Sequence, residues 1–492
     1  MLLRPPGTLR ASGRAMRRAL FLALLLWATP AAADHDHNHD SDSDPDPDPE
    51  LHHEHEHDRQ GFSFGSYGRV VAGSDLRGSS PEPVNVVAHG PRVVEPSYLE
   101  LDLYYRMRAP RGVDVTTVTT IAFGDSLFHA TGTFDARVAL RNLYLLAEKD
   151  LTCGRLGLWA GSRMLRGDDI YLLDYWPLDD VNTVGAGATL ASGPLDTGVH
   201  AGLNRLLDPY QFQEREVFTP EEGTETIPEL DRQRFIGTAQ ASYRFLGTGA
   251  PDVLSARVKL YAEAQALPSG TRRMEDDSVE KLPTDAGWSL GAQLALWGFA
   301  PGASHANLFA RHSRGLTAYD ELDTPMDLDT DKKSSGASEL VLGLGGNVEQ
   351  PWGGALLGAT TRRFTDGDPS SSDPDDGWEY ALDARPRARV LADLEAAVDV
   401  SWQVRFPRGL SPTTLSAADP AVFQIAPMAL YSPFGPGSYA RPQLRLVYRA
   451  AHLNAAARDQ LYALEDPRRT LTWVHFLGVQ AEWWFNSSTY RR

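Results

Sequence analysis

Cysteine is nearly absent from this sequence: its 492 residues contain one, Cys153. One thiol excludes an internal disulfide and any zinc or iron–sulfur site that needs several cysteines. Long apolar segments are also missing, because the run from Ala19 to Ala28 is too short to cross a bilayer as a helix. Hydrophobic residues make up 42% of the chain and charged residues 23%, so a helical membrane bundle and a wholly disordered chain are both excluded.

Basic residues are in deficit. The chain has 47 Lys and Arg against 65 Asp and Glu, a net charge of −18. Residues 1–33 hold five of the basic residues and residues 34–58 hold eleven of the acidic ones, which leaves 42 basic and 54 acidic residues in the body of the chain. Because phosphate recognition needs a basic face, the sequence predicts no nucleic-acid partner.

The N-terminus has the parts of a secretory signal peptide in order. Arg17 and Arg18 precede the apolar run, and the small residues Ala31 to Ala33 follow it. This order predicts export, with residues 1–33 removed by cleavage after Ala33.

Residues 34–60 are rich in histidine and aspartate. Between residues 34 and 58 the single large aliphatic side chain is Leu51, so this segment cannot fold by burial and is expected to be a disordered periplasmic spacer. Imidazole and carboxylate groups can bind divalent metal ions loosely. Composition favours a solvated spacer with incidental metal affinity over a selected metal role. The histidines are His35, His37, His39, His52, His53, His55 and His57.

From Gly61 onward, apolar and polar residues alternate with period two. In residues 98–108, leucines at 99, 101 and 103 share one face, while Glu100 and Asp102 share the other. The same alternation recurs in residues 255–265, 396–405 and 477–485. Alternation of this kind is typical of half-buried β-strands.

These segments continue from residue 61 to residue 485 without a linker, whereas a soluble sandwich domain rarely exceeds about 250 residues. A closed barrel in lipid explains both the length and the alternation. The sequence therefore predicts an all-β fold: a transmembrane antiparallel β-barrel of about 18 strands over residues 61–485, in outer-membrane lipid, with a short C-terminal extension, residues 486–492. Long loops on one rim are expected at residues 79–96, 208–230, 269–285, 320–336, 365–378, 407–419 and 455–470.

One segment, residues 166–182, breaks the alternation. It carries five acidic residues with Tyr171, Tyr175 and Trp176, and Pro177 argues against a central strand. Two interpretations remain open: a loop that folds into the pore and narrows it, or a surface loop above a small apolar cluster.

Several aromatic residues lie in phase with the polar face. Tyr67 alternates with Arg69, Tyr98 with Glu100, and Trp484 with Glu482; Tyr439 is in phase with Arg445. Rings on a watery face suit sugars, because sugars offer apolar C–H faces for stacking and hydroxyls for hydrogen bonds to neighbouring charged groups. Transport needs weak and closely spaced stops, so the pattern favours facilitated diffusion without chemistry.

At these residues the sequence resembles the maltoporins, the trimeric sugar-specific porins of bacterial outer membranes. The resemblance lies in GFSFGSYGR (61–69), SYLELDL (97–103), WAGSR (159–163) with DDIYLLDYW (168–176), YARPQLRL (439–446) and LGVQAEWWF (477–485). It implies a homotrimer for maltose-like or maltodextrin-like oligosaccharides, with no cofactor, an inward-folded constriction loop and a periplasmic N-terminal tail.

The resemblance also implies roles for individual residues. The aromatic slide along the lumen would comprise Tyr67, Tyr98, Trp176, Tyr439 and Trp484, and the flanking polar track Arg69, Glu100, Asp169 and Asp174. The sequence departs from the family at Gly167, where maltoporins have an arginine, and at Trp176, where they have a tyrosine. The mid-pore aromatic position falls near His305, and the chain runs seven residues past Phe485.

Three alternatives remain. The chain could be a general or ion-preferring porin of the same fold, or a porin whose histidine-rich tail gathers metal ions. A secreted β-rich glycosidase with Asp168, Asp169 or Asp174 as its acid–base pair is the third alternative and the least favoured, because paired carboxylates are common on loops.

Overall fold

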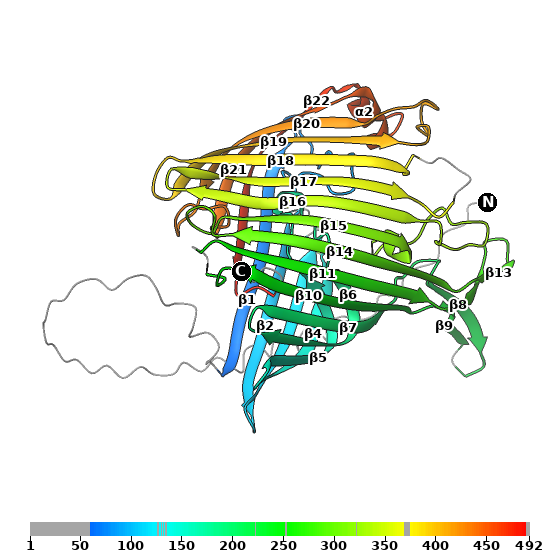
Figure 1. The fold of residues 1–492 in the computed structure, drawn as a ribbon. Coiled ribbons are helices and arrows are strands. Elements are labelled where there is room, and N and C mark those ends of the chain that lie inside the picture. Colours follow the sequence, from blue (N-terminus) through cyan, green and yellow to red (C-terminus); the bar gives the residue numbers. More distant parts are fainter. Residues whose placement is uncertain are drawn as a thin grey trace, which may run out of the picture. The chain divides into compact units, whose positions relative to one another are not determined.

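A computed structural model describes residues 60–488, without residues 125, 126, 129, 131, 133, 134, 222, 251, 252, 321 and 369–373. Eighteen strands form one antiparallel sheet. Strand β1 pairs with β2 on one side and with β22 on the other, where Tyr67 lies opposite Trp484. The sheet is therefore a closed barrel (Figure 1), and the predicted all-β barrel of about 18 strands is confirmed.

The barrel strands are β1 (Gly61–Ser74), β2 (Tyr98–Ala109), β3 (Val113–Gly124), β4 (Arg137–Leu151), β5 (Gly154–Arg166), β6 (Asp180–Ser192), β7 (Leu195–Asn204), β10 (Arg234–Leu246), β11 (Ser255–Leu267), β14 (Asp285–Trp297), β15 (His305–Gly315), β16 (Ser338–Gln350), β17 (Gly353–Thr365), β18 (Gly377–Arg389), β19 (Leu394–Pro407), β20 (Ala421–Tyr431), β21 (Gln443–Leu453) and β22 (Trp473–Phe485). Two short hairpins are β8 (Phe212–Thr219) with β9 (Gly223–Asp231), and β12 (Gly270–Arg273) with β13 (Val279–Leu282). The helical elements are η3 (Tyr171–Leu173), η4 (Leu316–Ala318), α2 (Ala455–Leu461) and η5 (Pro467–Thr470). Among the described residues, no helix is long and apolar enough to span a membrane.

Side-chain parity sorts the wall as the alternation predicts. On β2, Glu100 and Asp102 are fully buried toward the lumen, whereas Tyr105 is half exposed on the outer face. On β22, Glu482 is buried and Val479 is exposed. Because successive side chains of a strand point to opposite faces, the barrel has an apolar exterior and a polar interior. Other exposed exterior residues are Leu140, Leu158, Val199, Leu260, Leu342 and Leu446.

The two rims of the barrel differ. One rim, here the turn rim, has short connections such as residues 110–112, 152–153 and 351–352. The opposite rim, here the loop rim, carries the long connections, including residues 75–97, 167–179, 205–233, 268–284, 316–337, 408–420 and 454–472, and both short hairpins (Figure 1). Exposed aromatics mark both ends, with Phe62, Trp352 and Phe434 at the turn rim and Trp288 and Trp473 near the loop rim. This arrangement is typical of outer-membrane barrels.

Two loop-rim segments fold into the barrel. Residues 167–179, here the constriction segment, lie inside, which decides between the two interpretations of this stretch. Residues 75–97, here the first loop, also fold in, although the sequence suggested a loop at the rim. The backbone N–H of Val86 donates to the side-chain carbonyl of Gln403 at 2.8 Å, and the backbone N–H of Arg92, also in the first loop, donates to the carbonyl of Leu172 at 2.8 Å.

The inward segments share an apolar core with the wall. Ile170 and Leu173 of the constriction segment and Val84 and Val86 of the first loop are buried together with lumen-facing Val341, among others. Burial of aliphatic side chains inside the barrel holds both segments against the wall. The lumen is therefore narrowed by two packed segments, and the remaining passage is bounded by their polar and aromatic side chains.

Candidate functional site

Polar contacts fix both ends of the constriction segment. Near its start, Asp168 pairs with Arg257 of β11, with 2.7 Å between Oδ2 and Nη2. At its end, Asp179 pairs with Lys259 of the same strand, with 2.5 Å between Oδ2 and Nζ. Charge-assisted contacts of this length to one strand leave the segment little freedom to swing out of the lumen.

Glycines on the inner wall make room for the middle of the segment. A Cβ added at Gly345 would lie 3.1 Å from the carbonyl oxygen of Asp169, and one added at Gly358 would lie 3.2 Å from side-chain carbons of Ile170 and Leu172. A Cβ at Gly343 would lie 2.8 Å from Ile170. Strands β16 and β17 thus supply a shallow groove in which the segment lies close to the wall.

Aromatic rings form a connected row inside the lumen. Tyr98 and Tyr67 have ring centroids 6.0 Å apart. The ring centroid of Tyr171, in the constriction segment, lies 6.4 Å from that of Trp484 and 5.5 Å from that of Tyr439. Tyr439 in turn stacks on His305, with centroids 5.6 Å apart. Since Tyr98 begins β2 at the loop rim and His305 begins β15 at the turn rim, the row runs along the pore.

Arg92 of the first loop joins the two halves of this row. Its Nη2 donates to the Tyr67 hydroxyl at 2.6 Å, and its guanidinium carbon lies 5.0 Å from the centroid of Tyr171. The same Nη2 lies 3.3 Å from Oε1 of Glu482. One buried arginine therefore connects β1, β22 and the constriction segment.

Charged groups accompany the rings throughout. Glu482 receives ion pairs from Arg92, Arg441 and Arg445, and its Oε2 accepts the Tyr171 hydroxyl at 2.8 Å. Nearer the loop rim, the Tyr98 hydroxyl donates to Glu100 at 2.6 Å, and Arg141 binds both groups. A sugar passing the rings would therefore meet donors and acceptors at every step.

Asp174 links the constriction segment to β1 and the first loop. Its carboxylate lies 3.6 Å from Nη1 of Arg69 and 3.4 Å from Nη1 of Arg92. Burial by itself raises the pKa of the Asp174 carboxyl, but the guanidinium groups of Arg92, Arg69 and Arg166 outweigh burial, so the pKa lies below its ordinary value. Asp174 is therefore ionised at neutral pH.

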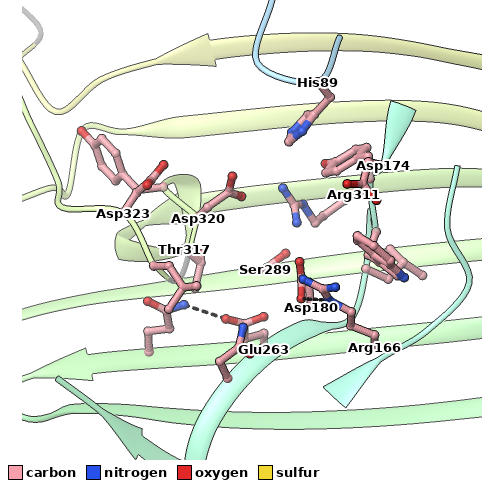
Figure 2. Close-up of a pocket in the computed structure, with 17 residues that line it drawn as sticks. His89, Arg166, Asp174, Asp180, Glu263, Ser289, Arg311, Thr317, Asp320 and Asp323 are labelled. Atoms are coloured by element: carbon pink, nitrogen blue, oxygen red, sulfur yellow. Dashed lines mark hydrogen bonds and ion pairs between the residues drawn. The ribbon is translucent and has the colours of Figure 1, made fainter. Parts of the chain in front are cut away.

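A cavity of about 240 Å³ lies on the other side of the constriction segment (Figure 2). Trp176 contributes to its lining, with the guanidinium carbon of Arg166 3.9 Å from its ring centroid. His89 stacks on Tyr175 with 3.5 Å between centroids, and burial lowers the pKa of His89, so its imidazole is neutral at pH 7. Tyr319, Asp320 and Asp323 are shared with a second cavity that opens among the loop-rim residues.

The lining of this cavity is acidic. Five carboxylates face two guanidinium groups, those of Arg166 and Arg311. Arg166 pairs with Asp180 at 2.8 Å, while Arg311 is held by Glu339, which is not a lining residue, at 2.5 Å. The carboxylates therefore dominate the field inside the cavity. They belong to Asp174, Asp180, Glu263, Asp320 and Asp323.

The residues singled out by the sequence are distributed around the lumen as follows. Tyr98, Trp484 and Tyr439 are partly exposed and in the row, while Tyr67 is also in the row but 3% exposed. Trp176 is buried at the cavity beside Arg166, and Asp169 is buried in the constriction segment. Arg69, Glu100 and Asp174 lie beside the rings. Whether these side chains bind solute stays a prediction.

Tyr439 occupies a different element from the one that its phase suggested. Strand β21 begins at Gln443, so Tyr439 belongs to residues 432–442, a long connection on the turn rim. This connection bends inward, because Ser438 is held by Glu349 through a backbone N–H bond of 3.0 Å and by Arg387 through its hydroxyl at 2.9 Å. Residues 1–59 lie outside the described residues, and they include the signal segment and the seven histidines of the tail.

Several residues of the site were missed by sequence reasoning. Arg92, Arg441 and Arg445 surround Glu482, although Arg445 was only placed on the polar face and none of the three was given a role. Tyr171 is central to the row, although the sequence offered it as one of a trio without a role. At Gly167 a Cβ would lie 1.9 Å from Asp179 Oδ1, so a side chain there would displace the carboxylate that pairs with Lys259. Arginines from other segments supply donors instead. The valines of the first loop were the available signal, since five of them stand in an otherwise polar stretch, at positions 84, 86, 87, 93 and 94.

A family model described as LamB porin matches residues 62–485. The chain belongs to the LamB porin family. Membership confirms the resemblance to maltoporins, and it makes the protein an outer-membrane channel and not an enzyme, so the glycosidase alternative is excluded. No curated protein matches the chain by sequence.

Solved structures similar to this LamB porin include outer-membrane channels. The DcaP channel of Acinetobacter baumannii has a TM-score of 0.45 and 10% identity, covering 86% of this chain and 96% of its own. OccAB1 of the same organism has a TM-score of 0.44 and 10% identity, with the same coverages. OpdK of Pseudomonas aeruginosa has a TM-score of 0.39 and 11% identity, covering 86% and 98%. Likenesses at this level say nothing about the solute of this LamB porin.

Proposed function

We propose that the protein mediates facilitated diffusion of sugars, of the maltose or maltodextrin type, across the outer membrane. The observation that carries the proposal is the row of rings from Tyr98 to His305, flanked by arginines and carboxylates along its length. Partly exposed Tyr98, Trp484 and Tyr439 offer stacking surfaces, and the neighbouring charged groups exchange hydrogen bonds with sugar hydroxyls. No energy input is required, because each ring binds the sugar weakly enough to release it to the next ring.

The geometry supports a stepwise passage. A solute entering at the loop rim first meets the second cavity, among the loop-rim residues, and then the 240 Å³ cavity. The two cavities share Tyr319, Asp320 and Asp323. Asp174 lines the 240 Å³ cavity and also contacts Arg69 and Arg92 beside the rings. It therefore stands between the cavity and the aromatic row.

The direct test is sugar block of ion current. Purified protein in a planar bilayer should show reversible interruptions of single-channel current when maltose, longer glucans or sucrose are added, with affinity rising with the number of glucose units. Current that is insensitive to the whole panel would rule out the sugar proposal and leave a general porin.

A matched pair of tyrosine substitutions distinguishes a ring that contacts the solute from a ring that only contributes to the barrel wall. Tyr98→Ala removes a ring from the lumen, whereas Tyr448→Ala removes one from the outer face, where its hydroxyl meets His475 at 2.9 Å. Each ring–sugar stacking contact is worth about 1 kcal/mol, so Tyr98→Ala should weaken the block roughly fivefold. Equal losses in both variants would count against a slide.

A cation-preferring porin is the second candidate, favoured by the acidic cavity. Carboxylates that outnumber guanidinium groups in a narrow passage raise the local concentration of cations. The double variant Asp320→Asn with Asp323→Asn should then shift the reversal potential in a KCl gradient toward anions. Sugar block with an unchanged reversal potential would favour the sugar proposal over this one.

Three further features are proposed on the strength of the family resemblance and the sequence. We propose a homotrimer, an exported chain cleaved after Ala33, and a periplasmic N-terminal tail. Chemical cross-linking of the detergent-extracted protein tests the first, and the mature N-terminal sequence tests the second. Deleting residues 34–58 tests the loose metal role of the tail: unchanged metal sensitivity of the cells would leave a plain spacer.

A further inference from the structure

The chain does not stop at the end of the closing strand. Phe485 ends β22 at the turn rim, and Asn486 then adopts a left-handed backbone conformation with φ of 44°. Its side-chain amide donates to the carbonyl of Phe64 at 3.1 Å, and its own carbonyl accepts the hydroxyl of lumen-facing Tyr104 at 2.9 Å. The turn at Asn486 therefore directs the chain back into the barrel.

Ser488 is held by three lumen-facing side chains. Its backbone N–H donates to Oδ2 of Asp102 at 3.0 Å, and its hydroxyl donates to Oδ1 at 2.6 Å. The hydroxyl also lies 3.1 Å from that of Thr120 and 3.4 Å from the amide nitrogen of Asn142. These partners come from β2, β3 and β4, so a polar site on three adjacent strands receives one serine.

Without Ser488, a buried carboxylate of the barrel wall would lose hydrogen-bond donors. Asp102 is fully buried, and a buried carboxylate needs donors for its oxygens. The wall supplies the hydroxyl of Thr120 at 2.5 Å, and Ser488 supplies two further donors. Removing the segment would leave Oδ2 of Asp102 without the backbone donor that it has now.

Gly65 shows that the inner wall accommodates the turn. A Cβ at this lumen-facing position would lie 1.9 Å from the carbonyl oxygen of Asn486, a distance that no side chain tolerates. The strand thus has its smallest residue where the returning chain crosses it. A residue with a side chain at position 65 would push the C-terminal segment away from the wall.

We propose that residues 486–488 are part of the pore: an internal strap that binds Asp102, Thr120 and Asn142 and narrows the passage at β1–β4. Asp102, which binds the strap, lies on the same strand as Glu100, two residues away, and Glu100 accepts the hydroxyl of Tyr98. It therefore limits the width of the lumen next to the first ring of the row. The proposal concerns width alone and holds for sugars and for ions.

The first test is truncation. A chain ending at Phe485 loses the strap, and Asp102→Ala keeps the full chain but removes the acceptor of Ser488. Both variants should conduct more ion current per channel than the parent, the truncation more than the substitution. Asp114→Ala is the matched control on the neighbouring strand, because Asp114 pairs with Arg155 at 3.5 Å, and its conductance should equal that of the parent.

Assembly is checked by heat-modifiable gel migration, so that conductance is compared among folded barrels. Folded variants with parental conductance would overturn the proposal. Because ion current is measured here, parental conductance would contradict only the strap and not the sugar proposal. A loss of sugar block together with raised conductance would be consistent with the strap.

A second measurement covers the case in which truncation prevents assembly. In a Cys153→Ser background, Ser487→Cys places a thiol at a position that is 2% exposed. A membrane-impermeant maleimide should label it slowly in the otherwise unchanged barrel and quickly when Asp102→Ala is added. Rapid labelling of both would show that the strap is not held in the lumen and would overturn the proposal.

Discussion

The guanidinium group of Arg441 lies over the indole ring of Trp484, with its central carbon 4.2 Å from the ring centroid. The same group donates to Oε2 of Glu482 from Nε at 3.0 Å and from Nη2 at 2.7 Å. A stacking surface and a hydrogen-bonding group are thus paired at one point of the lumen. Such a pairing is what a solute with both apolar faces and hydroxyls requires.

Arg441→Met tests this pairing, since methionine keeps an unbranched side chain over the ring but removes the charge. We expect sugar block to weaken about tenfold, the cost of one hydrogen bond to a charged group. The channel should also become more selective for cations, because Glu482 keeps its charge. Concentration–block curves and reversal potentials measure the two effects. Unchanged block would mean that Arg441 has a purely structural role.

Gly358→Ala tests how the constriction segment is held. The added methyl group would lie 3.2 Å from side-chain carbons of Ile170 and Leu172, closer than ordinary van der Waals contact. Overpacking of this kind costs about 1–3 kcal/mol, so the segment should shift and the open-channel current should become noisier.

Gly237→Ala is the control for that experiment. Position 237 has the outward parity of Phe235, and an added Cβ there meets the side chain of Phe235 at 3.3 Å. The control should leave the current noise unchanged. Equal noise in both variants would show that the groove at β16 and β17 does not hold the segment.

Asp174 gives the pore a response to acid. Its folded pKa is depressed, so its stabilising contacts with Arg92 and Arg69 are fully present above the ordinary pKa of an aspartate and are lost as pH falls through the lower, folded value. Conductance and sugar block should therefore be steady from neutral pH down to the ordinary aspartate range and change below it. Asp174→Asn should show the acid behaviour already at pH 7. A parental phenotype at pH 7 would contradict the role given to this carboxylate.

Strand parity was readable from the sequence because each barrel strand needs one apolar and one polar face. Glu100, Asp102 and Glu482 are lumen-facing for this reason, and Leu260 and Val479 are outside. Tyr439 shows the limit of the method: its phase was extended through a segment that is a turn and not a strand. It reaches the lumen because Glu349 and Arg387 hold the turn inward, which is a contact between distant parts of the chain.

The inward packing of the loops could be predicted less well. Apolar residues such as Val86 and Ile170 indicate burial, but their sequence does not say that the burial is inside the barrel. The arginines around Glu482 come from the first loop, a turn-rim connection and β21, and no local pattern joins them. The course of residues 486–488 depends likewise on Gly65 of β1 and Asp102 of β2. Both residues lie more than 380 residues earlier in the chain and come close to this segment only because β22 pairs with β1.

Sugar block in Trp484→Ala, compared with block in Trp402→Ala, tests most directly whether rings inside the lumen guide the solute. Trp484 lies beside Tyr171 in the row, and Trp402 is exposed on the outer face of β19. With maltodextrins in a planar bilayer, we expect a clear loss of block in Trp484→Ala and parental block in Trp402→Ala. Parental block in Trp484→Ala, or equal losses in the two variants, would contradict this expectation.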